Sequence, residues 1–122
     1  MELIHLFRVT HAHPIARRYF VVNGFDGALT MLGIIMGFYG SGEADTVVIV
    51  SACVGAAVAL GVSGVTSAYI SEAAERARQF QALEEAMVAN LEESVHDRAR
   101  KLVPVFVAAV NGVAPLSISL VI

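Results

Sequence analysis

The chain has 122 residues, about the length of one domain. Hydrophobic residues make up 57% of it and charged residues 16%, whereas a soluble domain has roughly 45–50% and about 25%, so a water-soluble globule is a poor description. The net charge of −3 without a basic run argues against a nucleic-acid partner, and the single cysteine, Cys53, excludes a disulfide framework or a Cys-x-x-Cys site.

Residues 1–18 are expected to form an interfacial segment on the membrane surface. They combine three histidines with a short apolar set that includes Leu3, Ile4 and Phe7, and they lack the long apolar core of a signal peptide. Pro14 is expected to break this segment.

Three long apolar stretches follow. Residues 46–70 and 102–122 contain no charge, and Asp26 is the only charge within residues 19–40. A helix needs about 20 apolar residues to cross the hydrocarbon core of a bilayer. The sequence therefore predicts an all-α membrane protein with three transmembrane helices, two within residues 19–70 and the third over residues 102–122.

Residues 71–101 form a linker between the second and third spans. All eight Lys and Arg residues lie in this linker or before the first span, which predicts that the N-terminus and the linker are cytoplasmic. The linker has no Gly or Pro and must return to the face that it left. We therefore expect three short helices: an extension of the second span, a connecting helix over 82–89 after a break near 79–81, and a return helix from Leu91 capped by Asn90.

Asp26 is the most informative single residue. It lies about two turns inside the first span, beside Asn23 and between Gly24 and Gly27. A carboxylate in hydrocarbon costs several kcal/mol, so such a residue normally faces a protein interior, a wet cavity or an ion path. The alternative is a carboxylate at the interface that pairs with a nearby arginine, Arg17 or Arg18.

Glu72 and Glu75 lie one turn apart where the second span ends. Residues at i and i+3 share a helical face, so both carboxylates are placed to bind one cation below the membrane. The alternative is that they pair with the neighbouring Arg76 and Arg78.

Further candidate metal ligands gather in the linker. Glu93 and His96 form a Glu-x-x-His pair, the spacing found in carboxylate-bridged di-iron bundles, although only one copy occurs here. Mixed carboxylate, imidazole and thioether ligands suit a ferrous-type ion, whereas a merely solvated helix is also rich in glutamate. The candidates are Glu84, Glu85, Met87, Glu92, Glu93 and His96.

Two other features of the spans concern helix packing. Gly33 and Gly37 form a small-xxx-small pattern that lets helices approach closely, either within the chain or between chains. Asn111, followed by Gly112 and Pro115, is expected to make a hydrogen bond between helices at a kink.

The chain resembles the vacuolar iron transporter family. The resemblance rests on Ala-Arg-Arg-Tyr-Phe-Val-Val-Asn-Gly-Phe-Asp-Gly at residues 16–27, which is similar to the Asn/Phe-Asp-Gly signature of that family's first span. Ser-Ala-Tyr-Ile-Ser-Glu at residues 67–72 and the prolines Pro104 and Pro115 of the third span support it. Members of the family have five spans and a longer linker, whereas this chain has three expected spans.

The resemblance implies a homodimer that moves Fe2+ or similar divalent ions out of the cytosol against protons, with the ion as substrate and no organic cofactor. It implies that Asp26 lies in the translocation path with Asn23 beside it, and that Glu72 lies at the cytoplasmic mouth. Capture of metal by the linker is then implied for Glu75, Glu84, Glu85, Met87, Glu92 and Glu93.

The leading hypothesis is therefore a metal transporter subunit, not an enzyme, in which linker carboxylates pass ions to Glu72 and Glu75 and then to Asp26. One alternative is a membrane-anchored di-iron oxidase or ferroxidase that uses Glu93 and His96 across a dimer. Another is a non-catalytic assembly subunit whose Asp26 pairs with a cation on a different membrane protein.

Overall fold

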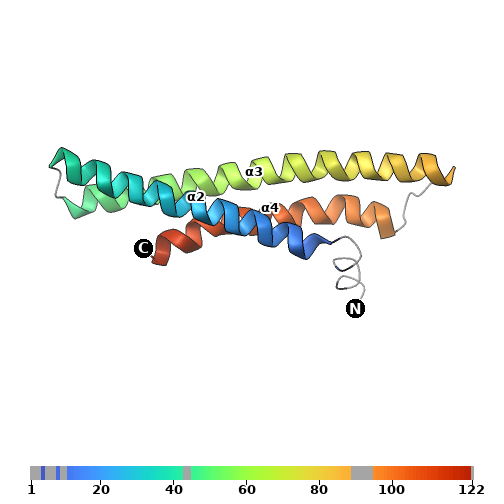
Figure 1. Ribbon diagram of the computed structural model, residues 1–122, viewed down its shortest axis with the longest axis horizontal. Helices are drawn as coiled ribbons and strands as arrows, with labels where there is room; N and C mark the ends of the chain where they lie inside the picture. The colour runs from blue at the N-terminus through green and yellow to red at the C-terminus, as the bar shows by residue number, and fades with distance from the viewer. Residues whose placement is uncertain (1–3, 5–7, 9–10, 43–44, 89–94, 122) are drawn as a thin grey trace.

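Three long helices make up the fold of the chain. The computed structural model describes residues 4, 8, 11–42, 45–88 and 95–121. The helices, labelled as in Figure 1, are α2 (Ala12–Ser41), α3 (Thr46–Met87) and α4 (Val95–Val121). Helices α2 and α4 run in one direction and α3 runs in the other, so the chain passes up, down and up again (Figure 1).

All three helices are long and apolar enough to cross a membrane, with 30 residues in α2, 42 in α3 and 25 over Asp97–Val121 of α4. This confirms the predicted all-helical fold with three apolar helices. At 1.5 Å per residue, α3 is about 63 Å long, roughly twice the thickness of the hydrocarbon core. The C-terminal part of α3 therefore extends beyond the apolar stretch that its sequence provides.

Local chemistry explains where the helices begin and end. Asp45 caps α3, because its carboxylate Oδ1 accepts a hydrogen bond of 2.8 Å from the Val47 N–H. Gly42 ends α2 with a φ of 78°, a left-handed conformation that glycine adopts without strain, and its N–H bonds to the Tyr39 carbonyl. Pro14 lies in the first turn of α2, where the backbone N–H of the helix would have no partner anyway.

Two of the boundaries predicted from the sequence are wrong. Pro14 does not break the N-terminal segment, because α2 begins at Ala12 and continues across position 18 into the first apolar stretch. No break occurs near 79–81 either, since α3 continues to Met87. The predicted cap at Asn90 and the start at Leu91 lie outside the described residues.

The uninterrupted course of α3 has a physical reason in its contact with α4. Phe80 of α3 is buried, and the guanidinium carbon of Arg100 on α4 lies 4.6 Å from the centre of its ring. An aromatic ring with an arginine over its face makes a favourable cation–π contact. This contact joins the end of α3 to the beginning of α4 and holds residues 79–81 in the helix.

The core between the helices is made of small residues. Small side chains allow helices to approach closely, and close packing replaces the hydrophobic effect as the driving force in lipid. The buried residues include Ala12, Ala16, Gly24 and Gly27 of α2, Ala57, Gly61, Gly64 and Ala68 of α3, and Ala99, Val103, Val107 and Ala108 of α4.

Helices α3 and α4 come close together at Gly112. A Cβ atom at this position would collide with Cγ2 of Val65 and would lie 3.1 Å from the carbonyl oxygen of Gly61. The backbones of α3 and α4 therefore meet here without an intervening side chain.

Replacing Gly112 by alanine is expected to destabilise the bundle by about 1–3 kcal/mol, because the new methyl group forces α3 and α4 apart. Gly55→Ala serves as the control, since a Cβ at Gly55 meets nothing within 4 Å, and it is expected to stabilise the helix by up to about 1 kcal/mol. Reversible unfolding in detergent measures both variants. Equal behaviour of the two would contradict the close contact at Gly112.

Candidate functional site

A set of hydrogen bonds joins all three helices in the middle of the bundle. Pro115 has no backbone N–H, so the carbonyl of Asn111, four residues earlier, loses its partner within α4. The side chain of Asn23 on α2 supplies the missing donor, with 2.7 Å between its Nδ2 and the Asn111 oxygen. Because no water satisfies backbone groups in hydrocarbon, this bond fixes where α2 crosses α4.

The side chain of Asn111 extends the same network to α3. Its Nδ2 donates to the Gly64 carbonyl at 2.8 Å, and the residue is 4% exposed. A Cβ at Gly64 would collide with Nδ2 of Asn23, so this position requires a glycine. The predicted role of Asn111 as a hydrogen-bonding group between helices is confirmed.

Asp26 lies on a different face of α2 from the network. It is exposed, as are its apolar neighbours Val22, Phe25 and Leu29, whereas the nearby Gly24 and Gly27 are buried. Among the described residues, no ion pair joins Asp26 to Arg17 or Arg18. The structure therefore places Asn23 inside the bundle and Asp26 on its outer surface, so the two side chains do not share one site within the chain.

Gly33 and Gly37 continue the face of α2 that carries Asp26. They follow it by two and three helical turns, and both are exposed. A Cβ added at either position would meet nothing within 4 Å. The small-xxx-small pattern thus serves no packing between the described parts of this chain, and α2 presents an acidic side chain and two glycines on one open face.

Glu72 and Glu75 lie in different surroundings near the beginning of the linker. Glu72 is buried, with 8% of its surface exposed, and its Oε2 lies 3.9 Å from Nε of Arg76. Tyr19 of α2 lies close enough to the same carboxylate to interact with it electrostatically. Glu75 is exposed, and its Oε1 accepts a hydrogen bond of 2.9 Å from Nε2 of Gln79.

The linker residues predicted to bind metal are only partly described. At the end of α3, Glu84 is half-buried, while Glu85 and Met87 are exposed. Glu92 and Glu93 lie outside the described residues, and only the backbone of His96 is described, in the first turn of α4. Within the described part of the chain, no group of three or more His, Cys, Asp or Glu side chains is placed to hold a metal ion.

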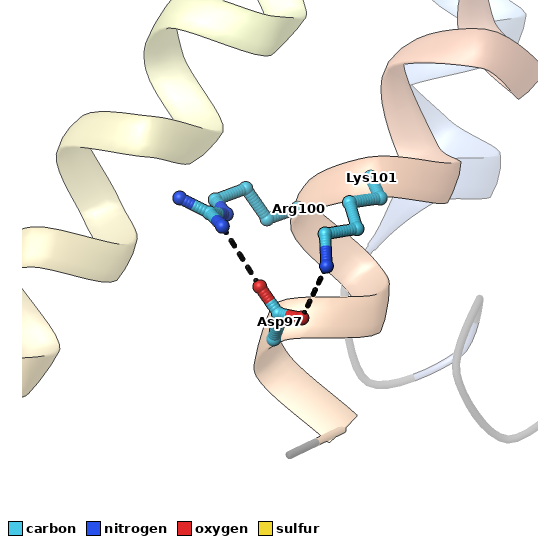
Figure 2. Close-up of polar contacts among 3 residues, drawn as sticks. All are labelled: Asp97, Arg100 and Lys101. Atoms are coloured by element: carbon cyan, nitrogen blue, oxygen red, sulfur yellow. Dashed lines mark hydrogen bonds and ion pairs between the residues drawn. The ribbon is translucent and has the colours of Figure 1, made fainter. Parts of the chain in front are cut away.

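Asp97 is a buried charge that the sequence reasoning missed. One of its carboxylate oxygens binds Arg100 at 2.9 Å and the other binds Lys101 at 2.7 Å, with Arg100 directed toward α3 (Figure 2). Residues at i+3 and i+4 lie on the same helical face, so this spacing was a usable signal.

Asp97 lies outside the uncharged stretch 102–122, and its surroundings favour the ionised carboxylate. The Lys101 hydrogen bond, and then that of Arg100, lower the pKa of Asp97 against the opposing effect of burial. A carboxylate whose pKa is lowered by folding stabilises the fold above its ordinary pKa, and this contribution is lost as the pH falls through the lowered value.

Replacing Asn23 by alanine is expected to cost about 1 kcal/mol, because it leaves the Asn111 carbonyl without a donor. In a Pro115→Ala background the same replacement should cost less, since alanine at this position restores an N–H to that carbonyl. Unfolding of the two single variants and the double variant in detergent measures the difference.

Thr30→Val is the control for this cycle, because Thr30 bonds to the Asp26 carbonyl within α2 and its effect should be the same in both backgrounds. An Asn23→Ala cost that does not depend on residue 115 would show that the Asn23 side chain does not replace the lost bond.

Comparison of the chain with models of protein families, with curated proteins and with solved structures found no match.

Proposed function

We propose that this chain is a subunit of a divalent-metal transporter that moves Fe2+ or Mn2+-type ions out of the cytosol in exchange for protons. The observation that carries the proposal is the exposed carboxylate of Asp26 within an otherwise uncharged stretch of α2. An ionisable residue inside a membrane is costly to maintain, and such residues serve as ion or proton sites. The resemblance of residues 16–27 to the vacuolar iron transporter family supports the same role.

The occupant of the Asp26 face is a second copy of the chain. Exposure of Asp26 to acyl chains is unfavourable, and Gly33 and Gly37 on the same face leave room for another helix to approach. Two α2 helices packed in this way bring two Asp26 carboxylates together. A pair of carboxylates matches the charge of a divalent cation, which one carboxylate alone does not.

In this proposal the glutamates of α3 supply ions to that pair. Apart from Arg8, which precedes α2, the described Lys and Arg residues lie on the beginning of α2, the C-terminal half of α3 and the beginning of α4. These segments gather at one end of the bundle (Figure 1). We assign this end to the cytosol by the distribution of positive charge. Glu84, Glu85 and Met87 capture ions there, Glu72 and Glu75 receive them, and Asp26 passes them through by alternating exposure to the two sides.

Replacing Asp26 by asparagine is expected to abolish metal transport, because the amide neither binds a divalent cation strongly nor exchanges a proton. Flux of Fe2+ into proteoliposomes, followed with an indicator dye trapped inside, measures the effect. Asp45→Asn is the matched control, since asparagine also caps a helix and Asp45 lies in the hairpin between α2 and α3. Equal flux through wild type and Asp26→Asn would defeat the proposed mechanism.

Gly33→Leu is expected to weaken the homodimer, because a leucine side chain keeps two α2 helices apart. The fraction of dimer in detergent or nanodiscs, measured by cross-linking or light scattering, should fall while the helical content stays the same. Gly55→Leu is the control, because Gly55 of α3 is also exposed and open but lies on the side of α3 opposite the buried Gly64. A dimer unaffected by Gly33→Leu would place the interface elsewhere.

The same exposed carboxylate favours one alternative function, an assembly subunit whose Asp26 pairs with a Lys or Arg of a different membrane protein. In that case a second protein would co-purify in constant ratio, Asp26→Asn would release it, and divalent metals would not alter the thermal stability of the chain. Transport in proteoliposomes that contain this chain alone would exclude the alternative.

A further inference from the structure

A continuous set of polar contacts on α3 connects the two carboxylates at the beginning of the linker. Nε of Arg76 lies 3.9 Å from Oε2 of Glu72, and Nη1 of Arg76 donates to Oε1 of Gln79 at 3.3 Å. The amide nitrogen of Gln79 then donates to Oε1 of Glu75 at 2.9 Å. Glu72 and Glu75, the pair expected to share one cation, are thus linked indirectly: the Arg76 guanidinium meets Glu72, and Gln79 joins Arg76 to Glu75.

Burial holds Arg76 in this place. The side chains of Arg76 and Glu72 are only 12% and 10% exposed, so both charges are largely removed from water. Tyr19 of α2 also interacts electrostatically with the Glu72 carboxylate, so a second helix contributes to the surroundings of this ion pair. Losing either charge of such a pair leaves the other one buried without compensation.

Arg78 offers a direct comparison two residues away. Arg78 is exposed, and among the described residues it forms no ion pair with Glu72 or Glu75. Of the two arginines that the sequence placed beside these carboxylates, Arg76 is the one that the described structure pairs with Glu72.

We propose that Arg76 is a tethered cation paired with Glu72 of the capture site, so that a metal ion must displace its guanidinium from that carboxylate in order to bind. This inference rests on the proposed transport function and adds a gate to it. A divalent ion carries twice the charge of arginine and competes for the same oxygens, whereas Na+ and K+ carry no more charge than the group that they would have to displace. Arg76 therefore sets both the affinity of the capture site and its preference for divalent over monovalent cations.

Binding of Mn2+ to the purified full chain tests the proposal. Neutral replacements of Arg76, R76Q and R76M, are expected to raise the affinity for Mn2+ by about tenfold, because they remove the competing positive charge. R76K keeps that charge and should stay near the wild-type affinity. R78Q, the matched control, should also leave the affinity unchanged, and E72Q and E75Q should lower it. Free Mn2+ measured by electron paramagnetic resonance reports all six variants.

Thermal unfolding gives a second readout that does not need transport. Without metal, R76Q and R76M should unfold at a lower temperature than wild type, since Glu72 is left buried without its partner. Added Mn2+ should then stabilise them more than it stabilises wild type, whereas a purely structural Arg76 would leave the gain from Mn2+ the same. Either neutral variant suffices if the other does not fold.

The outcomes separate this inference from the proposed function. If E72Q weakens Mn2+ binding but neither neutral Arg76 variant strengthens it, the tethered-cation role is overturned while the capture site stands. If E72Q and E75Q leave Mn2+ binding unchanged, the capture site itself is overturned, and the role of Arg76 falls with it.

Discussion

The missing backbone hydrogen bond at Pro115 is the constraint on which the arrangement of the three helices depends. In water the free carbonyl of Asn111 would be solvated, but in hydrocarbon it needs a donor from the protein. Asn23 of α2 provides that donor, and the Asn111 side chain binds the Gly64 carbonyl of α3. Two amide side chains therefore determine how all three helices cross, and the glycines around them let the backbones come close enough for these bonds to form.

The same crossing determines which way Asp26 faces. Asn23 and Asp26 are three residues apart, so turning Asn23 toward the Asn111 carbonyl leaves Asp26 on the neighbouring, open side of α2. The carboxylate lies among exposed apolar residues, in line with two open glycines. A charge in such surroundings needs an external partner, and the proposed metal ion shared between two copies of the chain meets that need.

Helices α3 and α4 extend beyond their apolar stretches at the charged end of the bundle. There, arginine side chains contact acidic and aromatic side chains. Arg100 lies over Phe80 and binds Asp97, while Arg76 binds Glu72, so cations are held close to acids on both α3 and α4. These contacts explain why α3 continues straight to Met87 when chain geometry alone suggested a break near 79–81. Burying Phe80 against α4 stabilises the straight helix, and a local sequence pattern does not include that contact.

The sequence by itself predicts three features: the three apolar helices, the gathering of Lys and Arg at one end, and the hydrogen bond that Asn111 makes between helices. These features depend on hydropathy, charge order and residue chemistry, which are local properties. The separation of Asn23 from Asp26, the burial of Glu72 beside Arg76 and the unbroken course of α3 do not. Each depends on the rotation of one helix against another. That rotation is decided by which small residues and polar groups meet across the bundle, and such contacts join residues as far apart as Asn23 and Asn111.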